Sequence, residues 1–190
     1  MKKALIIIDY INEIVNPAGK TPACAAMFAA NNSVEKINAV TKTARANGWL
    51  VIWVKVAFSA DYCEIHPNSK LFANAKKYGA YLRDTWATAL VDGLEYQNSD
   101  IIVYKNRVSA FFATNLDLLL SANNVEKVYI AGVSTEMAIQ TTVRDAHDLD
   151  YKVNIIGDLC ASGSPEWHNS SLEMLGRIAE IVNSADIVHG

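Results

Sequence analysis

The sequence predicts an α/β protein with a doubly wound, mainly parallel sheet of six strands and helices on both faces. Strand-length apolar runs alternate with amphipathic helical patterns along the whole chain, which is the order expected of βαβ units. The runs lack the polar alternation of a half-exposed strand, as expected when helices cover both faces of a sheet. At 190 residues the chain has the size of one domain, so we expect a single domain over 1–190.

The strands are predicted from the apolar runs, and the helices from the polar residues at their ends. Helix starts are marked by Ser, Thr or Asn caps, in one case with a proline at the first helical position. Residues 57–99 are less regular, and there we expect a short helix near 69–77 and loops able to cover a site. The predicted strands are ALIII (4–8), LVIWVKV (50–56), IIVY (101–104), VYIA (128–131), VNII (153–156) and DIV (186–188), and the cap signals are Asn32 with Glu35, Thr114 with Asp117, and Ser164 before Pro165.

Composition excludes several classes of partner. The formal net charge is only -3, which argues against a nucleic-acid-binding surface and leaves a small molecule or a second copy of the chain as the expected partner. The apolar runs are far shorter than the roughly 20 residues of a membrane span, and the run after MKK is too brief for a signal peptide. We therefore expect a cytoplasmic protein without membrane contact. Three widely spaced cysteines predict free thiols.

Candidate functional residues follow three of the predicted strands. Asp9 follows the first, Lys105 follows the third, and the turn from Ser134 to Ala138 follows the fourth. Because ligands bind beyond the carboxyl ends of the strands in open α/β sheets, a carboxylate, an ammonium and a helix N-terminus should meet at one edge. Each also has a structural reading: Asp9 as a helix cap, Lys105 as a solvated charge, and Thr135 as a simple N-cap.

Five sequence blocks, in order, resemble the isochorismatase-like superfamily of cysteine hydrolases, which includes nicotinamidases and N-carbamoylsarcosine amidases. The blocks are LIIIDYIN at the start, DTWA (84–87), VYKNRVSAF (103–111), AGVSTEMAIQTTVRDA (131–146) and DLCASGSPEWH (158–168). The resemblance implies the Rossmann-like three-layer fold of that superfamily. It also implies a catalytic aspartate, lysine and cysteine, which fall on Asp9, Lys105 and position 138.

The chain departs from the family at the nucleophile. The family pattern is G-x-x-T-x-x-C, whereas residues 132–138 read GVSTEMA, so Ala138 stands in the place of the cysteine. A cysteine there would be a thiolate favoured by the helix N-terminus and by Lys105, with Asp9 as general base and then acid. The resemblance further implies an oxyanion hole from the backbone N–H groups of Ser134 and residue 138, with a cis peptide between Val133 and Ser134.

Three interpretations of Ala138 follow. In the first, the protein is a hydrolase of a small amide or carbamoyl compound whose cysteine was deliberately changed to alanine, because every partner of a cysteine is kept. In the second, Asp9 acts as proton donor to a vinyl ether, as in true isochorismatases, which also lack the cysteine; their turn, GVYAHxGC, does not match this chain. In the third, the chain is a natural pseudoenzyme that binds a metabolite.

The expected pocket walls are aromatic residues near the strand ends, and the resemblance implies hydrolysis without an organic cofactor. We expect Trp86, Phe111, Phe58 and Tyr62 to surround a compact planar amide. We expect no metal site, since Asp61 and His66 do not reproduce the Asp-x-His spacing that nicotinamidases use. The resemblance also implies a homodimer or homotetramer, and the sequence leaves open whether a neighbouring subunit completes the pocket.

Overall fold

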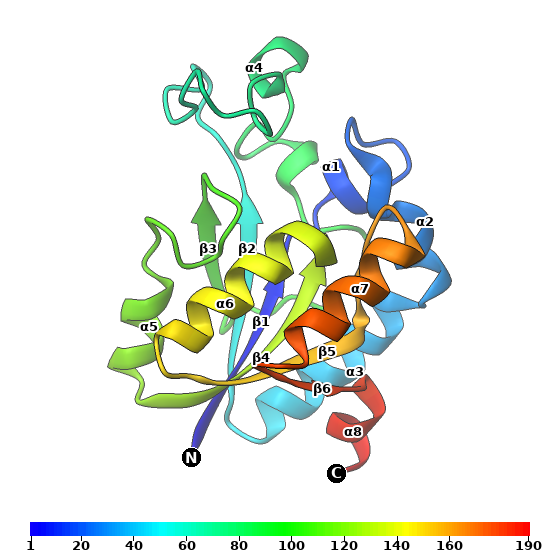
Figure 1. Ribbon diagram of the computed structural model, residues 1–190, viewed down its shortest axis with the longest axis vertical. Coiled ribbons are helices and arrows are strands. Elements are labelled where there is room, and N and C mark those ends of the chain that lie inside the picture. Colours follow the sequence, from blue (N-terminus) through cyan, green and yellow to red (C-terminus); the bar gives the residue numbers. More distant parts are fainter.

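The computed structural model describes all 190 residues and contains a six-stranded, wholly parallel sheet (Figure 1). The strand order is β3-β2-β1-β4-β5-β6, which confirms the predicted fold class. The chain builds outward from β1 to β3 and then returns to the other side of β1, so the order reverses between β1 and β4. The strands are β1 (Lys2–Ile8), β2 (Leu50–Val56), β3 (Ile101–Lys105), β4 (Val125–Val133), β5 (Lys152–Ala161) and β6 (Glu180–Val182).

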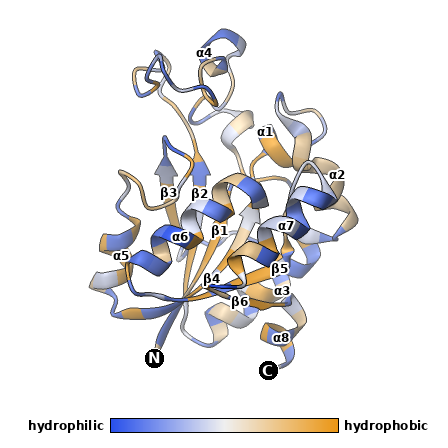
Figure 2. Ribbon diagram, in the orientation of Figure 1, coloured by the Kyte–Doolittle hydropathy of each residue, from blue (hydrophilic) through white to orange (hydrophobic).

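Helices cover both faces of the sheet, and alternate residues of β1 show how the core divides. Ile6 and Ile8 belong to the core beneath α5, α6 and α7, whereas Leu5 and Ile7 belong to the core beneath α2, α3 and α8. In Figure 2 the strands are largely orange, and blue segments lie on the helices that cover them. The helices are α1 (Asn12–Val15), α2 (Ala25–Ala30), α3 (Ser33–Ala46), α4 (Ala75–Tyr78), α5 (Leu116–Ala122), α6 (Gln140–Asp148), α7 (Pro165–Leu175) and α8 (Ser184–His189).

The last predicted strand was wrong. Residues 186–188 lie in α8, and the sixth strand is Glu180–Val182, which pairs with β5 at the edge of the sheet. The reason is a capping box: the Asn183 backbone N–H donates to Asp186 Oδ2 at 2.8 Å, which starts a helix where the apolar run DIV predicted a strand. A three-residue edge strand has too short a pattern to stand out.

Other element ends differ in detail from the expectations. Ser164 caps α7 by accepting a hydrogen bond from the Trp167 backbone N–H, as predicted. Asn32 instead has a left-handed backbone and no side-chain cap to α3. The short helix expected near 69–77 is α4, one turn that ends at Gly79 with a φ of +60°. No helix of the structure combines the length and the apolar character needed to cross a bilayer.

Candidate active site

Asp9 and Lys105 form a buried ion pair at the carboxyl edge of the sheet. Asp9 follows β1 and Lys105 ends β3, on either side of β2, and Asp9 Oδ2 lies 2.8 Å from Lys105 Nζ. Asp9 Oδ1 accepts a hydrogen bond from the Val56 backbone N–H at 2.7 Å, so each carboxylate oxygen has one donor. Burial raises the pKa of Asp9, and the charge and hydrogen bonds of Lys105 oppose that rise without cancelling it.

The Lys105 ammonium is held in place by three acceptors. Besides Asp9, it donates to the backbone carbonyls of Arg107 and Val108 at 3.2 and 3.1 Å. An ammonium has three N–H donors, so all of them are used. The loop that supplies these carbonyls is tied to α6, because the Ser109 hydroxyl bonds Asp145 and the Ala110 N–H donates to the Thr142 hydroxyl. The cation is therefore positioned by the chain before any ligand binds.

The turn after β4 carries Ala138 to the same edge. It contains a cis peptide between Val133 and Ser134 and continues as a single-turn π-helix, η3 (Thr135–Ile139). The Ser134 backbone N–H donates to no acceptor within the chain. Close approach to β1 depends on Gly132, where an added Cβ would lie 2.4 Å from the Ile8 carbonyl oxygen. A side chain at residue 132 would push this turn away from Asp9.

Thr135 joins this turn to α7 through its side chain. Its hydroxyl lies 2.9 Å from His168 Nδ1, and Thr135 itself is fully buried. Thr135 was expected to be the N-cap of the helix, but the N-cap position is Ser134, whose side chain makes no cap hydrogen bond. The hydroxyl of Thr135 contacts His168 instead. Burial lowers the pKa of His168, and the charge of Glu136 acts in the opposite direction.

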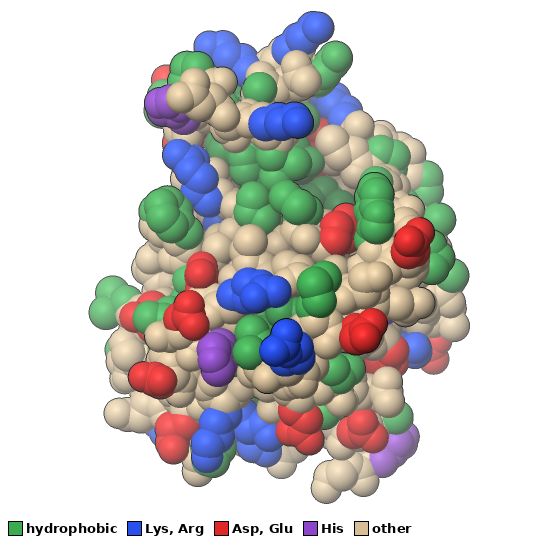
Figure 3. All heavy atoms as spheres, in the orientation of Figure 1, with side chains coloured by type: hydrophobic (Ala, Val, Ile, Leu, Met, Phe, Trp, Pro, Cys, Tyr) green, Lys and Arg blue, Asp and Glu red, His purple; other side chains and the backbone are tan.

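These residues share one cavity of about 730 Å³, which opens below α4. Asp9, Lys105, Ser134 and Ala138 all line it. Figure 3 shows apolar side chains gathered in the hollow between the α4 segment and the ends of the strands. Most of the wall is hydrophobic, and it includes Ile14, Val56, Leu71, Phe72, Ala75, Tyr78, Tyr81 and Val108. A volume of this size accommodates more than a compact planar amide.

None of the four aromatic residues expected as pocket walls lines this cavity. Trp86 is 51% exposed on a 3-10 turn, and Phe111 packs against Tyr151 in the core beneath α5 and α6. Phe58 and Tyr62 are buried one layer behind the wall, where the Phe58 ring contacts the Phe72 ring at a centroid distance of 5.2 Å. They support the wall because residues 57–82 fold back over the strand ends, which places Phe72 and Tyr81 at the surface of the cavity instead.

Several lining residues could not be found from the sequence. Lys20 and Cys24 come from the segment after α1, and Glu136 from the turn itself. Lys20 Nζ donates to the carbonyls of Tyr78 and Gly79, both at 2.7 Å, and so links that segment to the end of α4. Lys20 and Cys24 follow no strand and show no periodicity, whereas Glu136 lies inside the predicted turn after the fourth strand but had no role assigned to it. Cys24 is buried, and burial raises the pKa of its thiol to about 12, with smaller contributions from the charges of Glu136 and Asp9.

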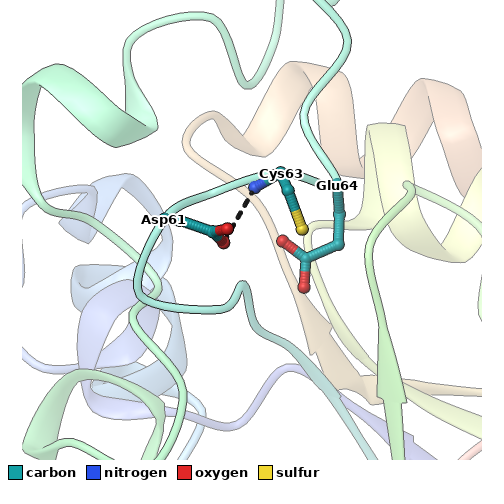
Figure 4. A group of neighbouring side chains, drawn as sticks. All are labelled: Asp61, Cys63 and Glu64. Carbon is teal, nitrogen blue, oxygen red and sulfur yellow. Dashed lines mark hydrogen bonds between the residues drawn. The ribbon is translucent and has the colours of Figure 1, made fainter.

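Asp61, Cys63 and Glu64 form a cluster of possible metal ligands in the loop after β2 (Figure 4). Its carboxylates are held by groups of the same loop: the Ser59 hydroxyl lies 2.6 Å from Asp61 Oδ1 and 2.8 Å from Glu64 Oε2. The Cys63 backbone N–H also donates to Asp61 at 3.2 Å. His66 is not part of the cluster and accepts a hydrogen bond from the Asn68 N–H. These bonds describe a loop that stabilises its own turn.

Comparison with known proteins agrees with the resemblance in the sequence. The family model described as the isochorismatase domain matches residues 3–186. A probable inactive nicotinamidase of Arabidopsis thaliana is 33% identical over 171 residues, which cover 89% of this chain and 85% of that protein. The ureidoacrylate amidohydrolase RutB of Azorhizobium caulinodans is 30% identical over 179 residues, 86% of this chain and 78% of that protein.

A solved structure of an isochorismatase family protein from Desulfovibrio vulgaris superposes with a TM-score of 0.86 at 28% identity. It covers 98% of this chain and 96% of its own. The family model, the two relatives and the solved structure each match most of the length of this chain. The chain belongs to the isochorismatase family of hydrolases and is related to amidohydrolases.

Proposed function

We propose that this site is that of a hydrolase of small amides or carbamoyl compounds, present here without its nucleophilic sulfur. The observation that carries the proposal is the buried Asp9–Lys105 pair, 2.8 Å apart, which shares a cavity with the methyl group of Ala138. A buried ion pair has a large desolvation cost, so a pair that faces a cavity is better explained by chemistry than by stability.

With a cysteine at position 138, each group has a defined role. Asp9 takes the thiol proton, and the thiolate attacks the amide carbonyl carbon to form a tetrahedral oxyanion. The backbone N–H groups of Ser134 and residue 138 donate to that oxygen. Asp9 then returns the proton to the nitrogen, the C–N bond breaks, and water hydrolyses the thioester. Lys105 keeps Asp9 in place and favours the thiolate by its charge. In the unmodified chain no covalent step is available at Ala138.

The test is to make Ala138→Cys and to measure ammonia release from primary amides, carbamoyl and ureido compounds. We expect turnover by this variant and none by the unmodified chain. Because Cys24 also lines the cavity, the control is the double variant Ala138→Cys with Cys24→Ala, which should retain turnover. A folded Ala138→Cys protein with no activity on the whole panel would contradict the proposal. Turnover of an enol ether by the unmodified chain would instead support chemistry by Asp9 alone.

A second candidate function is binding of a metabolite without turnover. The specific observation in its favour is that one relative at 33% identity bears the name of a probable inactive nicotinamidase. The codon for residue 138 in the source genome separates the two candidates: a cysteine codon identifies an introduced alanine, and an alanine codon supports the binding function.

A further inference from the structure

Glu136 is a second carboxylate in the cavity, and it has no cationic partner. It lies in η3, two residues before Ala138, and lines the same cavity as Asp9 and Lys105. It also borders a shallow surface hollow beside Trp167 and Met174. Its Oε2 atom is withdrawn from solvent and makes no hydrogen bond within the chain, and no Lys, Arg or His lies within 4.0 Å of it. Asp9, by contrast, has a donor on each oxygen and a cation, Lys105, beside it.

The charge of Glu136 affects the pKa values of neighbouring groups, but none of these groups neutralises it. The charge of Glu136 opposes the lowering of the His168 pKa, and it adds to the burial that raises the pKa of Cys24. Nδ1 of His168 is already engaged by Thr135. The other lysine of the cavity, Lys20, is held on two carbonyls of the α4 segment. A buried acceptor without a donor is unfavourable, and a donor on a ligand would relieve that cost.

The remaining wall restricts what such a ligand can be. Its body must be apolar, because most of the lining is hydrophobic, with Phe72, Val108 and Leu71 among its members. Its amide group belongs at Asp9 and residue 138. The only carboxylate left for a charged group on the ligand is Glu136.

We propose that Glu136 is a specificity residue which selects amides that carry a protonated amine on an apolar body. This inference rests on the proposed function for the position of the amide, and goes beyond it by naming the substrate class. A charge-assisted hydrogen bond from an ammonium to Glu136 Oε2 would partner the one unpaired carboxylate of the cavity. The amine distinguishes these ligands from nicotinamide-like and simple aliphatic amides, which offer Glu136 no cation.

The test compares two isosteric pairs that differ only in the charged group. The pairs are 4-(aminomethyl)benzamide with 4-ethylbenzamide, and 5-aminopentanamide with hexanamide. Isothermal titration calorimetry on the unmodified chain gives the ratio of Kd values within each pair. In at least one pair we expect the ammonium compound to bind roughly tenfold more tightly than its methyl isostere. Glu136→Gln, which keeps the shape of the side chain, should reduce that ratio to about twofold or less.

The matched control is Glu173→Gln, the same change at an exposed position of α7, which should keep the ratio of the unmodified chain. A general structural effect of Glu136→Gln would weaken both members of a pair and leave their ratio alone. Equal binding within both pairs, no measurable binding of either ammonium compound, or a preference that survives Glu136→Gln would each overturn the inference.

Failure of this inference and failure of the proposed function give different results. If Ala138→Cys hydrolyses the two members of each pair equally well, in both pairs, the amidase function is supported and the role of Glu136 is refuted. If the unmodified chain binds the ammonium compounds more tightly in a way that depends on Glu136, but Ala138→Cys hydrolyses no amide, the role of Glu136 is supported and the amidase function is refuted.

Discussion

Strand β3 has a buried carboxylate–cation pair at each end, and the two pairs differ in the donors around the carboxylate. At the amino end, Asp100 accepts hydrogen bonds from Arg45, from Trp53 Nε1 at 2.9 Å and from the Gln97 N–H at 3.1 Å. At the carboxyl end, Asp9 accepts one bond on each oxygen, and the pair faces a cavity.

The difference appears in the pKa values of the two carboxyl groups. Burial alone would raise the pKa of Asp100, but the hydrogen bonds from Arg45 and Trp53 outweigh it and hold the pKa below its usual range. For Asp9 burial dominates, and the pKa is raised despite Lys105. A carboxylate surrounded by donors keeps its charge and anchors structure, whereas one with few donors beside a cavity can exchange a proton with a ligand. Under the proposed function, the same type of ion pair thus serves two purposes.

The largest expected effect is on turnover. In the Ala138→Cys protein, Asp9→Asn should lower kcat/KM for amides by about 10²- to 10⁴-fold, because the general base and acid is removed. Asp100→Asn in the same background should change kcat/KM by less than about threefold, since Asp100 lies at the opposite end of β3 and does not line the cavity. Steady-state assays of ammonia release measure kcat/KM for the two variants. If Asp9→Asn kept full turnover, Asp9 would have no part in the mechanism.

The next effect is on stability. Lys105→Met should lower the free energy of unfolding by about 3–5 kcal/mol, because it leaves the buried Asp9 carboxylate without its cation. Urea unfolding followed by circular dichroism measures this. The matched control is Lys36→Met, which removes the cation from Asp158 at a partly exposed pair 3.0 Å apart and should cost no more than about 1 kcal/mol. Similar losses in the two variants would contradict the larger cost assigned to leaving the buried Asp9 carboxylate without its cation.

Asp100→Asn should destabilise the protein by about 1.5–3 kcal/mol at pH 7, through weaker hydrogen bonds with Arg45 and Trp53. Since the folded-state pKa of Asp100 lies below its ordinary value of 3.8, its contribution is complete above pH 3.8. That contribution is lost as the pH falls through the folded-state pKa. The difference in unfolding free energy between the unmodified chain and Asp100→Asn should therefore shrink in acid; a constant difference between pH 2.5 and 5 would contradict this prediction.

The smallest expected effect is a pH dependence of opposite sign at Asp9. Because its folded-state pKa lies above the ordinary value of 3.8, the native state binds more protons than the unfolded state in the interval between the two values. The contribution of Asp9 to stability should therefore fall as the pH rises through that interval. Urea unfolding of the unmodified chain and of Asp9→Asn from pH 3 to 7 measures the difference in unfolding free energy. If the contribution of Asp9 to the unfolding free energy rose with pH, as expected for Asp100, the two ion pairs would not differ in the way proposed.

Much of the fold and the floor of the site could be predicted from the sequence, because both depend on strands. Five of the six strands follow from apolar runs, and Asp9 and Lys105 immediately follow or end two of them. Parallel strands bring their carboxyl ends to one edge, so residues about a hundred positions apart in the chain meet there. The sixth strand could not be found, since three residues at an edge carry little pattern, and a capping box turned the next apolar run into α8.

The sequence by itself determined five of the six strands, the meeting of Asp9 and Lys105 at one edge of the sheet, and the missing sulfur at residue 138. Only the tertiary structure decided the walls of the cavity, where Phe72 and Tyr81 stand in front of Phe58, and the isolation of the Glu136 carboxylate. The physical reason is that periodic burial leaves a local pattern in the chain. The course of an irregular segment, and the presence or absence of a partner for one charge, depend on contacts between distant residues.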